Sequence, residues 1–331
     1  MRQPQIVRRL LVAALLTSFV ALPASAQQVR LRVDFVDAGN WVEKSWIRFY
    51  VDLLDAEFRV VSGLSGEDVE VFTAGEKDPI PGKAEVSEFR ETREGVAVAI
   101  LMAGHNAYAP FEDDGDDDGD DSVTPQVFPL QKLGVQNFIR KLEGNDKVAI
   151  FMYDERSLRT IDTFSSMFPE AAQAVESNAR LSREAGSAKG AQNLAPRLFN
   201  HIMEVIESKF GEQEDLPRRK ILILMSDGMD VNSGNPERIE QRIKDIVQVA
   251  HDYDIKIYTL GFSLGGSDAL RYLRELSTKT GGVYREISPT AASTIPDVFA
   301  GLADEIKRQY VITFTSEDLE GGRAHRFRVQ L

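Results

Sequence analysis

The chain has 331 residues, of which 43% are hydrophobic, and it contains no cysteine. This length and apolar content suffice for two domains with substantial cores, while the lack of cysteine excludes a disulfide framework and cysteine catalysis. The formal net charge of −13 argues against nucleic acid and anionic membrane surfaces as ligands, because both attract clustered lysine and arginine.

The N-terminus has the features of a secretory signal peptide. Three arginines precede a 13-residue, largely apolar run at 10–22, and Ala24 and Ala26 stand at the −3 and −1 positions of a cleavage site. A membrane anchor would need about 20 apolar residues. We therefore expect residues 1–26 to be removed and the mature chain to begin at Gln27. Losing three arginines lowers the net charge from −13 to −16. The expected protein is exported, periplasmic or secreted, with no membrane insertion after cleavage.

Residues 27–95 are predicted to form a small module rich in β-strands. Short runs of β-branched and aromatic residues alternate with breakers that contain glycine or proline, at the spacing of a β-sandwich. The predicted strands are residues 29–36, 47–54, 58–61 and 69–72. The pattern changes near Gly95, where we place the end of this module.

From residue 96 onward, strands that are apolar throughout alternate with helices. The strands are expected at residues 96–101, 147–153, 158–164, 220–225, 255–260 and 283–287. The helices are expected at residues 130–142, 193–209, 236–253, 268–279 and 294–308, with Asn235 and Ser267 as N-caps of two of them. Such strands are buried on both faces, which predicts a doubly wound, mostly parallel α/β sheet over residues 96–310.

Residues 311–331 are assigned to C-terminal β-strands that return to the β-rich part of the chain. Two strands are expected there, at residues 310–315 and 325–330, and a turn that contains Gly321 and Gly322 joins them.

A strongly acidic loop is predicted at residues 112–121, where eight of ten residues are Asp or Glu and two are Gly. Such a run repels itself and cannot be buried, so it is expected to be solvated. Its first half also fits a calcium loop with Gly119 at position 6, although Pro125 stands where a closing Glu is expected. The carboxylates offered for a weak calcium site are those of Asp114, Asp116, Asp118 and Asp120. Both interpretations stay open.

Several segments taken together resemble the von Willebrand factor type A (VWA) domain of bacterial exported proteins, over about residues 96–310. They are residues 138–153, Ser226-Asp227-Gly228, residues 260–262, residues 280–284 and the helix that runs into Tyr310. The resemblance implies a Rossmann-like α/β fold with an adhesion site for a divalent metal ion at three loops beyond the carboxyl ends of the strands.

Carried onto this chain, the resemblance places Met102, Gly104 and Asn106 at the ligand positions of the first loop. Gln192 stands at the second-loop position and Asp227 at the third. Magnesium requires hard oxygen ligands, whereas a thioether is soft and glycine has no side chain. The resemblance therefore implies a binding face whose metal site is mostly lost.

Asp227 has two interpretations once the metal is removed. A donor on His105 or Asn106 could satisfy its carboxylate, or the carboxylate could cap the local backbone at Gly228. The sequence leaves both open.

Features of an enzyme are absent from the sequence. The four histidines, one of which is His201, lack the i, i+4 spacing of a zinc site, and no Gly-x-Ser-x-Gly nucleophile turn occurs. The expected function is non-catalytic protein–protein binding or scaffolding, with the acidic loop selecting a basic protein partner. The alternative is a calcium-dependent binding module that uses the acidic loop. No cofactor is expected apart from the weakly bound calcium of this alternative, and no oligomeric state is predicted.

Overall fold

The computed structural model describes residues 30–37, 46–54, 63–73, 78–104, 127–154, 157–181, 197–230, 232, 234–262, 268–316 and 327–330. The expected signal peptide, the strand at 58–61 and the acidic loop at 112–121 lie outside these residues. The chain divides into two compact units, which are Glu94–Asp304 and the combination of Met1–Arg93 with Glu305–Leu331.

The unit Glu94–Asp304 is built on a six-stranded sheet of order β10-β9-β8-β5-β6-β7. The neighbours from β10 to β6 are parallel, and β7 is antiparallel to β6. The strands are β5 (Val96–Ala103), β6 (Lys147–Tyr153), β7 (Leu158–Ser165), β8 (Arg219–Ser226), β9 (Ile255–Phe262) and β10 (Tyr284–Ile287). This arrangement confirms the predicted mostly parallel α/β sheet.

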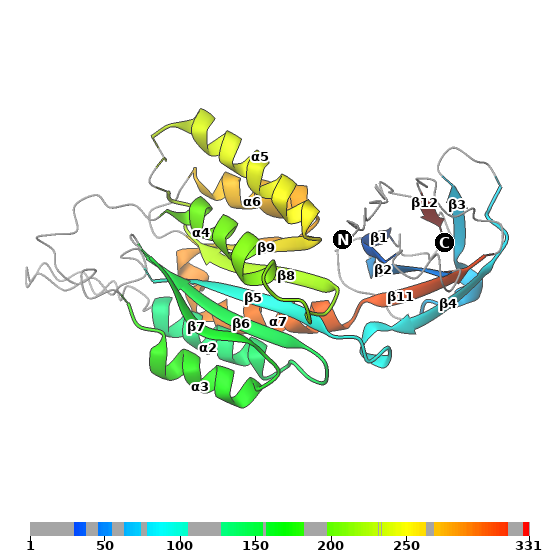
Figure 1. Cartoon of the computed structure of the whole chain (residues 1–331), viewed down its shortest axis with the longest axis horizontal. Coiled ribbons are helices and arrows are strands. Elements are labelled where there is room, and N and C mark those ends of the chain that lie inside the picture. Colours follow the sequence, from blue (N-terminus) through cyan, green and yellow to red (C-terminus); the bar gives the residue numbers. More distant parts are fainter. Residues whose placement is uncertain are drawn as a thin grey trace, which may run out of the picture. The chain divides into compact units, whose positions relative to one another are not determined.

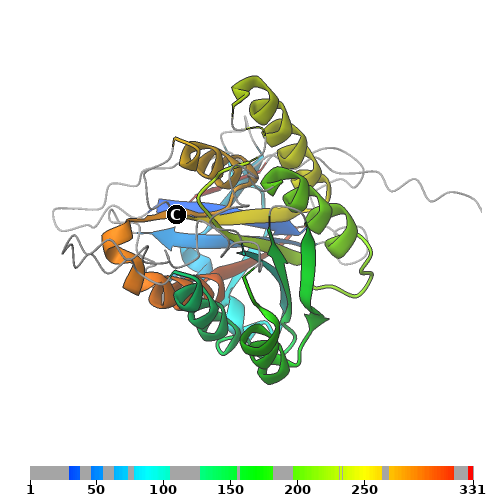
Figure 2. The ribbon, with the colours of Figure 1, turned by 90° about the vertical axis from the view of Figure 1, so that its left-hand side faces the viewer.

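Helices cover both faces of this sheet, as the apolar strands predicted (Figure 1). One face carries α4 (Leu198–Glu204), α5 (Pro236–Asp252) and α6 (Leu270–Thr280). The other carries α2 (Val127–Ile139), α3 (Phe168–Asn178) and α7 (Ile295–Lys307). Figure 2 shows the strands between α5 and α6 on one side and α2 and α3 on the other. Because helices lie on both faces, all eight residues of β5 are buried.

The other unit contains two antiparallel sheets that share one core. Its larger sheet has the order β1-β2-β11-β4, and its smaller sheet pairs β12 with β3. Phe49, Val51 and Ile312 of the larger sheet belong to the same buried cluster as Val71 and Val329 of the smaller one. The strands are β1 (Arg30–Asp37), β2 (Trp46–Leu54), β3 (Glu70–Thr73), β4 (Lys83–Glu88), β11 (Tyr310–Thr315) and β12 (Phe327–Gln330). The unit is therefore sandwich-like.

Several expected elements differ from the observed ones. α2 begins three residues before its predicted start at 130. The helix predicted at 193–209 appears as α4, which begins at Leu198 and continues as a π-helical segment, Val205–Phe210. The N-cap of α6 is Ala269 rather than Ser267, which lies outside the described residues. Helix ends are set by local capping and packing, so their exact positions are the least predictable feature.

Two elements, α3 and β4, were not predicted. α3 was missed because only Ala171 and Val175 are buried on it, which is a weak apolar stripe. β4 was missed because none of its residues is fully buried. The C-terminal strands do not pair with each other, since β11 lies between β2 and β4 while β12 pairs with β3. Across the described part of the chain, no helix is long and apolar enough to cross a membrane.

Candidate functional site

The candidate site lies where β5 and β8 end side by side. The two strands are parallel neighbours, with Leu101 opposite Leu224 just before their ends. The connection from β5 to β6 passes through α2 on one face of the sheet, while the connection from β8 to β9 passes through α5 on the other. Ligands of open α/β sheets bind at such a switch point. The sheet therefore brings Met102, Gly104 and Asp227 to one edge.

The end of β5 is packed rather than open. The Met102 side chain is fully buried, and in the sheet Met102 lies opposite Met152. The backbone N–H of Gly104 donates to the carbonyl oxygen of Tyr153 at 2.8 Å, and a Cβ at Gly104 would collide with Cε of Met152. Met102 and Gly104 therefore support this edge from within and offer no side chain to a ligand. His105 and Asn106 lie outside the described residues.

A buried amide on α2 holds the last residue of β5. The side chain of Gln131 is fully buried and, in the orientation that satisfies it, donates to the carbonyl oxygen of Ala103 and accepts from its N–H, both at 3.1 Å. The two hydrogen bonds assign this orientation of the amide. The contact fixes the backbone immediately before Gly104.

The end of β8 is polar, and a hydrogen bond joins it to β6. The hydroxyl of Tyr153 donates to Oγ of Ser226 at 2.9 Å, and the N–H of Gly228 donates to the same oxygen at 3.0 Å. Burial, followed by the nearby Asp227 carboxylate, raises the pKa of Tyr153 well above its usual value. The phenol therefore stays protonated and remains a donor at physiological pH.

Asp227 serves the turn that follows β8. Its Oδ1 accepts a hydrogen bond from the N–H of Met229 at 3.0 Å, and the residue is 7% exposed. Gly228 between them has a φ of 77°, which favours glycine, and a Cβ there would lie 2.5 Å from the carbonyl oxygen of Ala269. This geometry supports the interpretation in which Asp227 caps the local backbone.

A second carboxylate joins this loop to α4. Oδ2 of Asp230 accepts from the N–H of Phe199 at 3.2 Å, and Oδ1 accepts from both the N–H and the Nδ2 of Asn232 at 2.9 Å. Phe199 lies in the first turn of α4, which follows the segment that contains Gln192. Asp230 therefore holds the second loop's helix against the third loop, although Gln192 itself lies outside the described residues.

Two further titratable groups lie beside this cluster. Asp154 follows β6, and its Oδ1 accepts from the N–H of Ser157 at 2.8 Å. His201 on α4 is 6% exposed, its ring centroid is 6.2 Å from that of Tyr153, and among the described residues neither ring nitrogen has a hydrogen-bond partner. Burial lowers the pKa of His201 below 6.5, against the opposing effect of the Glu204 carboxylate 3.7 Å away. The imidazole is therefore neutral at pH 7.

The donors at this edge do not fit a magnesium ion. Met102 presents a soft, fully buried thioether where the resemblance requires a carboxylate, and Gly104 presents no side chain. Within the described ranges, no group of three or more His, Asp or Glu side chains is placed to hold a metal ion. The carboxylates of Asp227 and Asp230 instead accept hydrogen bonds from backbone N–H groups.

The sequence interpretation missed four residues of this site, namely Gln131, Tyr153, Asp154 and Asp230. A signal existed for two of them, because Asp154 directly follows an apolar strand and Asp230 closely follows Asp227. Nothing in the sequence marked Gln131 or Tyr153, whose hydrogen bonds reach residues on other elements.

The chain is similar to three solved structures at low identity. The PilB minor pilin from Streptococcus sanguinis is 13% identical, with 85% of this chain and 79% of that chain covered and a TM-score of 0.46. The vWF domain of the type V pili tip protein Mfa5 from Porphyromonas gingivalis is 12% identical, with 64% and 95% covered and a TM-score of 0.44. A von Willebrand factor type A protein from Catenulispora acidiphila is 11% identical, with 94% and 71% covered and a TM-score of 0.47.

A comparison with curated proteins found no match. The family model described as von Willebrand factor type A domain matches residues 118–299, which is more than half of the chain. The matched range begins after β5, so Met102 and Gly104 lie outside it. The chain belongs to the von Willebrand factor type A domain family, whose members generally serve as adhesion or protein-binding modules.

Proposed function

We propose that this protein is an exported, non-catalytic module that binds a protein partner at the carboxyl ends of β5 and β8 without a metal ion. The observation that carries this proposal is the complete burial of Met102 at the position where the family's site needs a carboxylate. A metal-dependent adhesion site keeps one coordination position open for the partner. Among the described residues, no group of three or more His, Asp or Glu side chains is placed to hold such an ion.

The surface at this edge offers an apolar contact in place of a metal. Met229, directly after the Asp227-Gly228 turn, is 38% exposed, and few other large apolar side chains in the described part of the chain are so exposed. Methionine adapts its shape to different partners and is common at binding surfaces. The carboxylates of Asp227 and Asp230 hold the turn that presents it. We infer that Met229 anchors the partner.

The partner is proposed to be basic. The net charge of −13 and the eight acidic residues of the loop at 112–121 favour association with a positively charged protein. Because such steering acts mainly on the association rate, it should weaken as the salt concentration rises.

A photo-cross-linking experiment in the native host tests this proposal. A photoreactive amino acid replaces Met229, and a matched variant carries it at Leu133, an apolar side chain on α2 that is 43% exposed. We expect a discrete cross-linked protein from Met229 and none from Leu133, with equal yield in chelator and in calcium. Equal cross-linking from both positions would contradict the proposed surface. A yield that depends on calcium would instead support the alternative in which the acidic loop binds calcium.

A further inference from the structure

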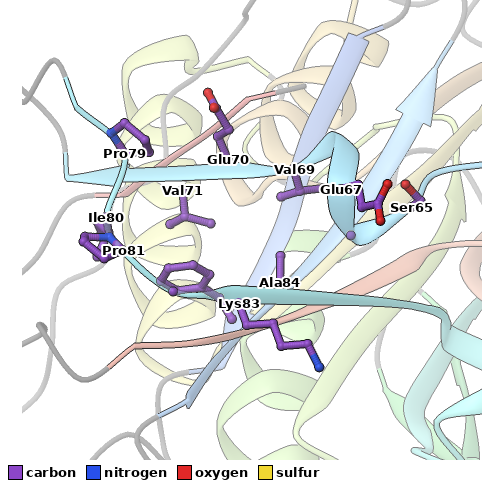
Figure 3. A pocket seen from close by; sticks show the side chains of 13 residues that line it. Ser65, Glu67, Val69, Glu70, Val71, Pro79, Ile80, Pro81, Lys83 and Ala84 are labelled. Carbon is purple, nitrogen blue, oxygen red and sulfur yellow. The ribbon is translucent and has the colours of Figure 1, made fainter.

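The sandwich-like unit contains a groove. It runs between β3 and β4 and has a volume of about 950 Å³, which lies within the range of about 300–1,000 Å³ that is common for ligand sites. Figure 3 shows Val69, Val71 and Ala84 pointing into the space between these strands. Ile80 and its two flanking prolines lie at one end, and Ser65 and Glu67 lie at the other.

The groove reaches the apolar core of this unit. Val71 and Phe314 line it and are almost completely buried members of that core, while Ile80 and Ala84 are partly buried against the same cluster. β4 is an edge strand of the four-stranded sheet, and the facing sheet has two described strands. Among the described residues, the smaller sheet therefore leaves part of the larger one uncovered, and the groove offers apolar contact beside the first residues of β3 and β4.

One end of the groove is acidic. Glu67 belongs to the 3₁₀ turn Gly66–Asp68, is exposed, and has no ion-pair partner among the residues described in this unit. The next residue, Asp68, accepts hydrogen bonds from the Oγ and N–H of Ser65, which lower the pKa of its carboxyl, so it stays ionised. Lys83 does not neutralise this end, because its Nζ lies 2.7 Å from Oε1 of Glu85.

We propose that this groove binds an extended peptide segment of a partner protein, with apolar side chains against Ile80 and Ala84 and a lysine or arginine beside Glu67. An extended chain suits the shape, because the groove lies between the first residues of two strands and joins an end with two prolines to a polar end. A basic side chain suits the charge, because the described residues around the acidic end supply no cation for Glu67. This surface belongs to the sandwich-like unit and shares no residue with the strand ends of the α/β unit.

A peptide selection on the intact chain tests the proposal. The probe is a displayed library of random ten-residue peptides, and the affinity of the enriched peptides is then measured by fluorescence polarisation. We expect the enriched peptides to combine neighbouring apolar residues with a lysine or arginine. The Glu67→Lys variant should bind them about fivefold more weakly or worse, since one attractive pair becomes repulsive.

Asp78→Lys is the matched control, because it makes the same charge change at an exposed residue that does not line the groove. Asp78 precedes Pro79, at the end of the groove opposite Glu67, so we expect the affinity of this variant to stay close to that of the parent (Figure 3). Ile80→Asp should abolish binding by placing a charge against the apolar peptide, and its folding is checked by circular dichroism. If Ile80→Asp fails to fold, the comparison of Glu67→Lys with Asp78→Lys still decides. Equal effects of these two charge-reversal variants on peptide affinity would overturn the proposal. A selection that yields no peptides would also overturn it, because the groove would then be covered by the chain itself.

Discussion

The ends of β5 and β8 are neighbours at one edge of the same sheet, yet they are built in opposite ways. At the end of β5 a thioether is buried and an amide from Gln131 holds the backbone. At the end of β8, Ser226, Asp227 and Asp230 each accept a hydrogen bond from a backbone N–H. Asp227 therefore accepts a hydrogen bond within its own turn, whereas the Met102 side chain at the end of β5 belongs to the buried core.

The largest expected effect comes from restoring a carboxylate at the end of β5. Met102→Asp removes a buried thioether and places a charge where no solvent reaches, so we expect the free energy of unfolding to fall by about 4 kcal/mol. Urea unfolding followed by far-UV circular dichroism measures this change. The helical signal reports on the α/β unit, because all the described α-helices begin there.

Met102→Leu is the control for this variant. It keeps an apolar side chain of similar volume and should cost less than about 1.5 kcal/mol. If millimolar Mg²⁺ stabilised Met102→Asp, the end of β5 would be able to bind a metal ion in the folded state, because a ligand raises stability only when it binds the folded chain. That result would contradict the description of this strand end as part of the core.

The next effect tests whether the polar end of β8 is structural. Asp230→Ala leaves the N–H groups of Phe199 and Asn232 without their acceptor, so we expect the free energy of unfolding to fall by about 3 kcal/mol. Asp230→Asn keeps one oxygen and should lose less. A change below about 1 kcal/mol for the alanine variant, measured by the same unfolding experiment, would show that this carboxylate is retained for another reason.

Much of the α/β fold could be predicted because apolar runs and caps are local features. α5 was expected at residues 236–253 and is observed at Pro236–Asp252, and Oδ1 of its N-cap Asn235 accepts from the N–H of Arg238 at 3.1 Å. The position of β11 between β2 and β4 could not be derived in this way. That pairing joins segments more than two hundred residues apart, and no local pattern specifies it.

The sequence could predict only those residues of the candidate site that a local pattern marks. The strand endings pointed to Asp227, but the sequence could not show that Met102 is fully buried, since burial at a strand end depends on the loops around it. The Tyr153–Ser226 hydrogen bond joins residues 73 positions apart. Such contacts follow from strand order, which local sequence patterns do not specify.

A smaller effect on stability tests how rigid the turn after β8 is. Gly228 and Gly144 have similar φ values, 77° and 61°, but a Cβ at Gly228 would meet backbone at 2.5 Å while nothing lies within 4 Å of one at Gly144. We expect Gly144→Ala to lower the free energy of unfolding by about 1 kcal/mol, which is the conformational cost alone. Gly228→Ala should cost about 2 kcal/mol or more, since the turn must also shift. Equal costs would mean that the turn accommodates a side chain and is less fixed than the hydrogen bonds of Ser226 and Asp227 indicate.

The smallest expected effect is a dependence of stability on pH, through the buried imidazole of His201 near the end of β8. Burial lowers the pKa of His201 below its ordinary value of 6.5, with Arg197 acting in the same direction and Glu204 and Asp154 opposing it. As the pH falls through about 6.5, the unfolded chain takes up a proton before the folded chain does, so the folded state loses stability until the pH reaches the lowered pKa.

Urea unfolding measures this effect between pH 7.5 and pH 5, which is roughly the window set by these pKa values. The free energy of unfolding should fall with pH in the parent and should change less with pH in His201→Phe. Glu204→Gln removes the carboxylate that opposes the shift, so its loss should extend to lower pH than in the parent. A profile in Glu204→Gln that is flatter than the parent's would show that another group dominates the acid sensitivity of this region.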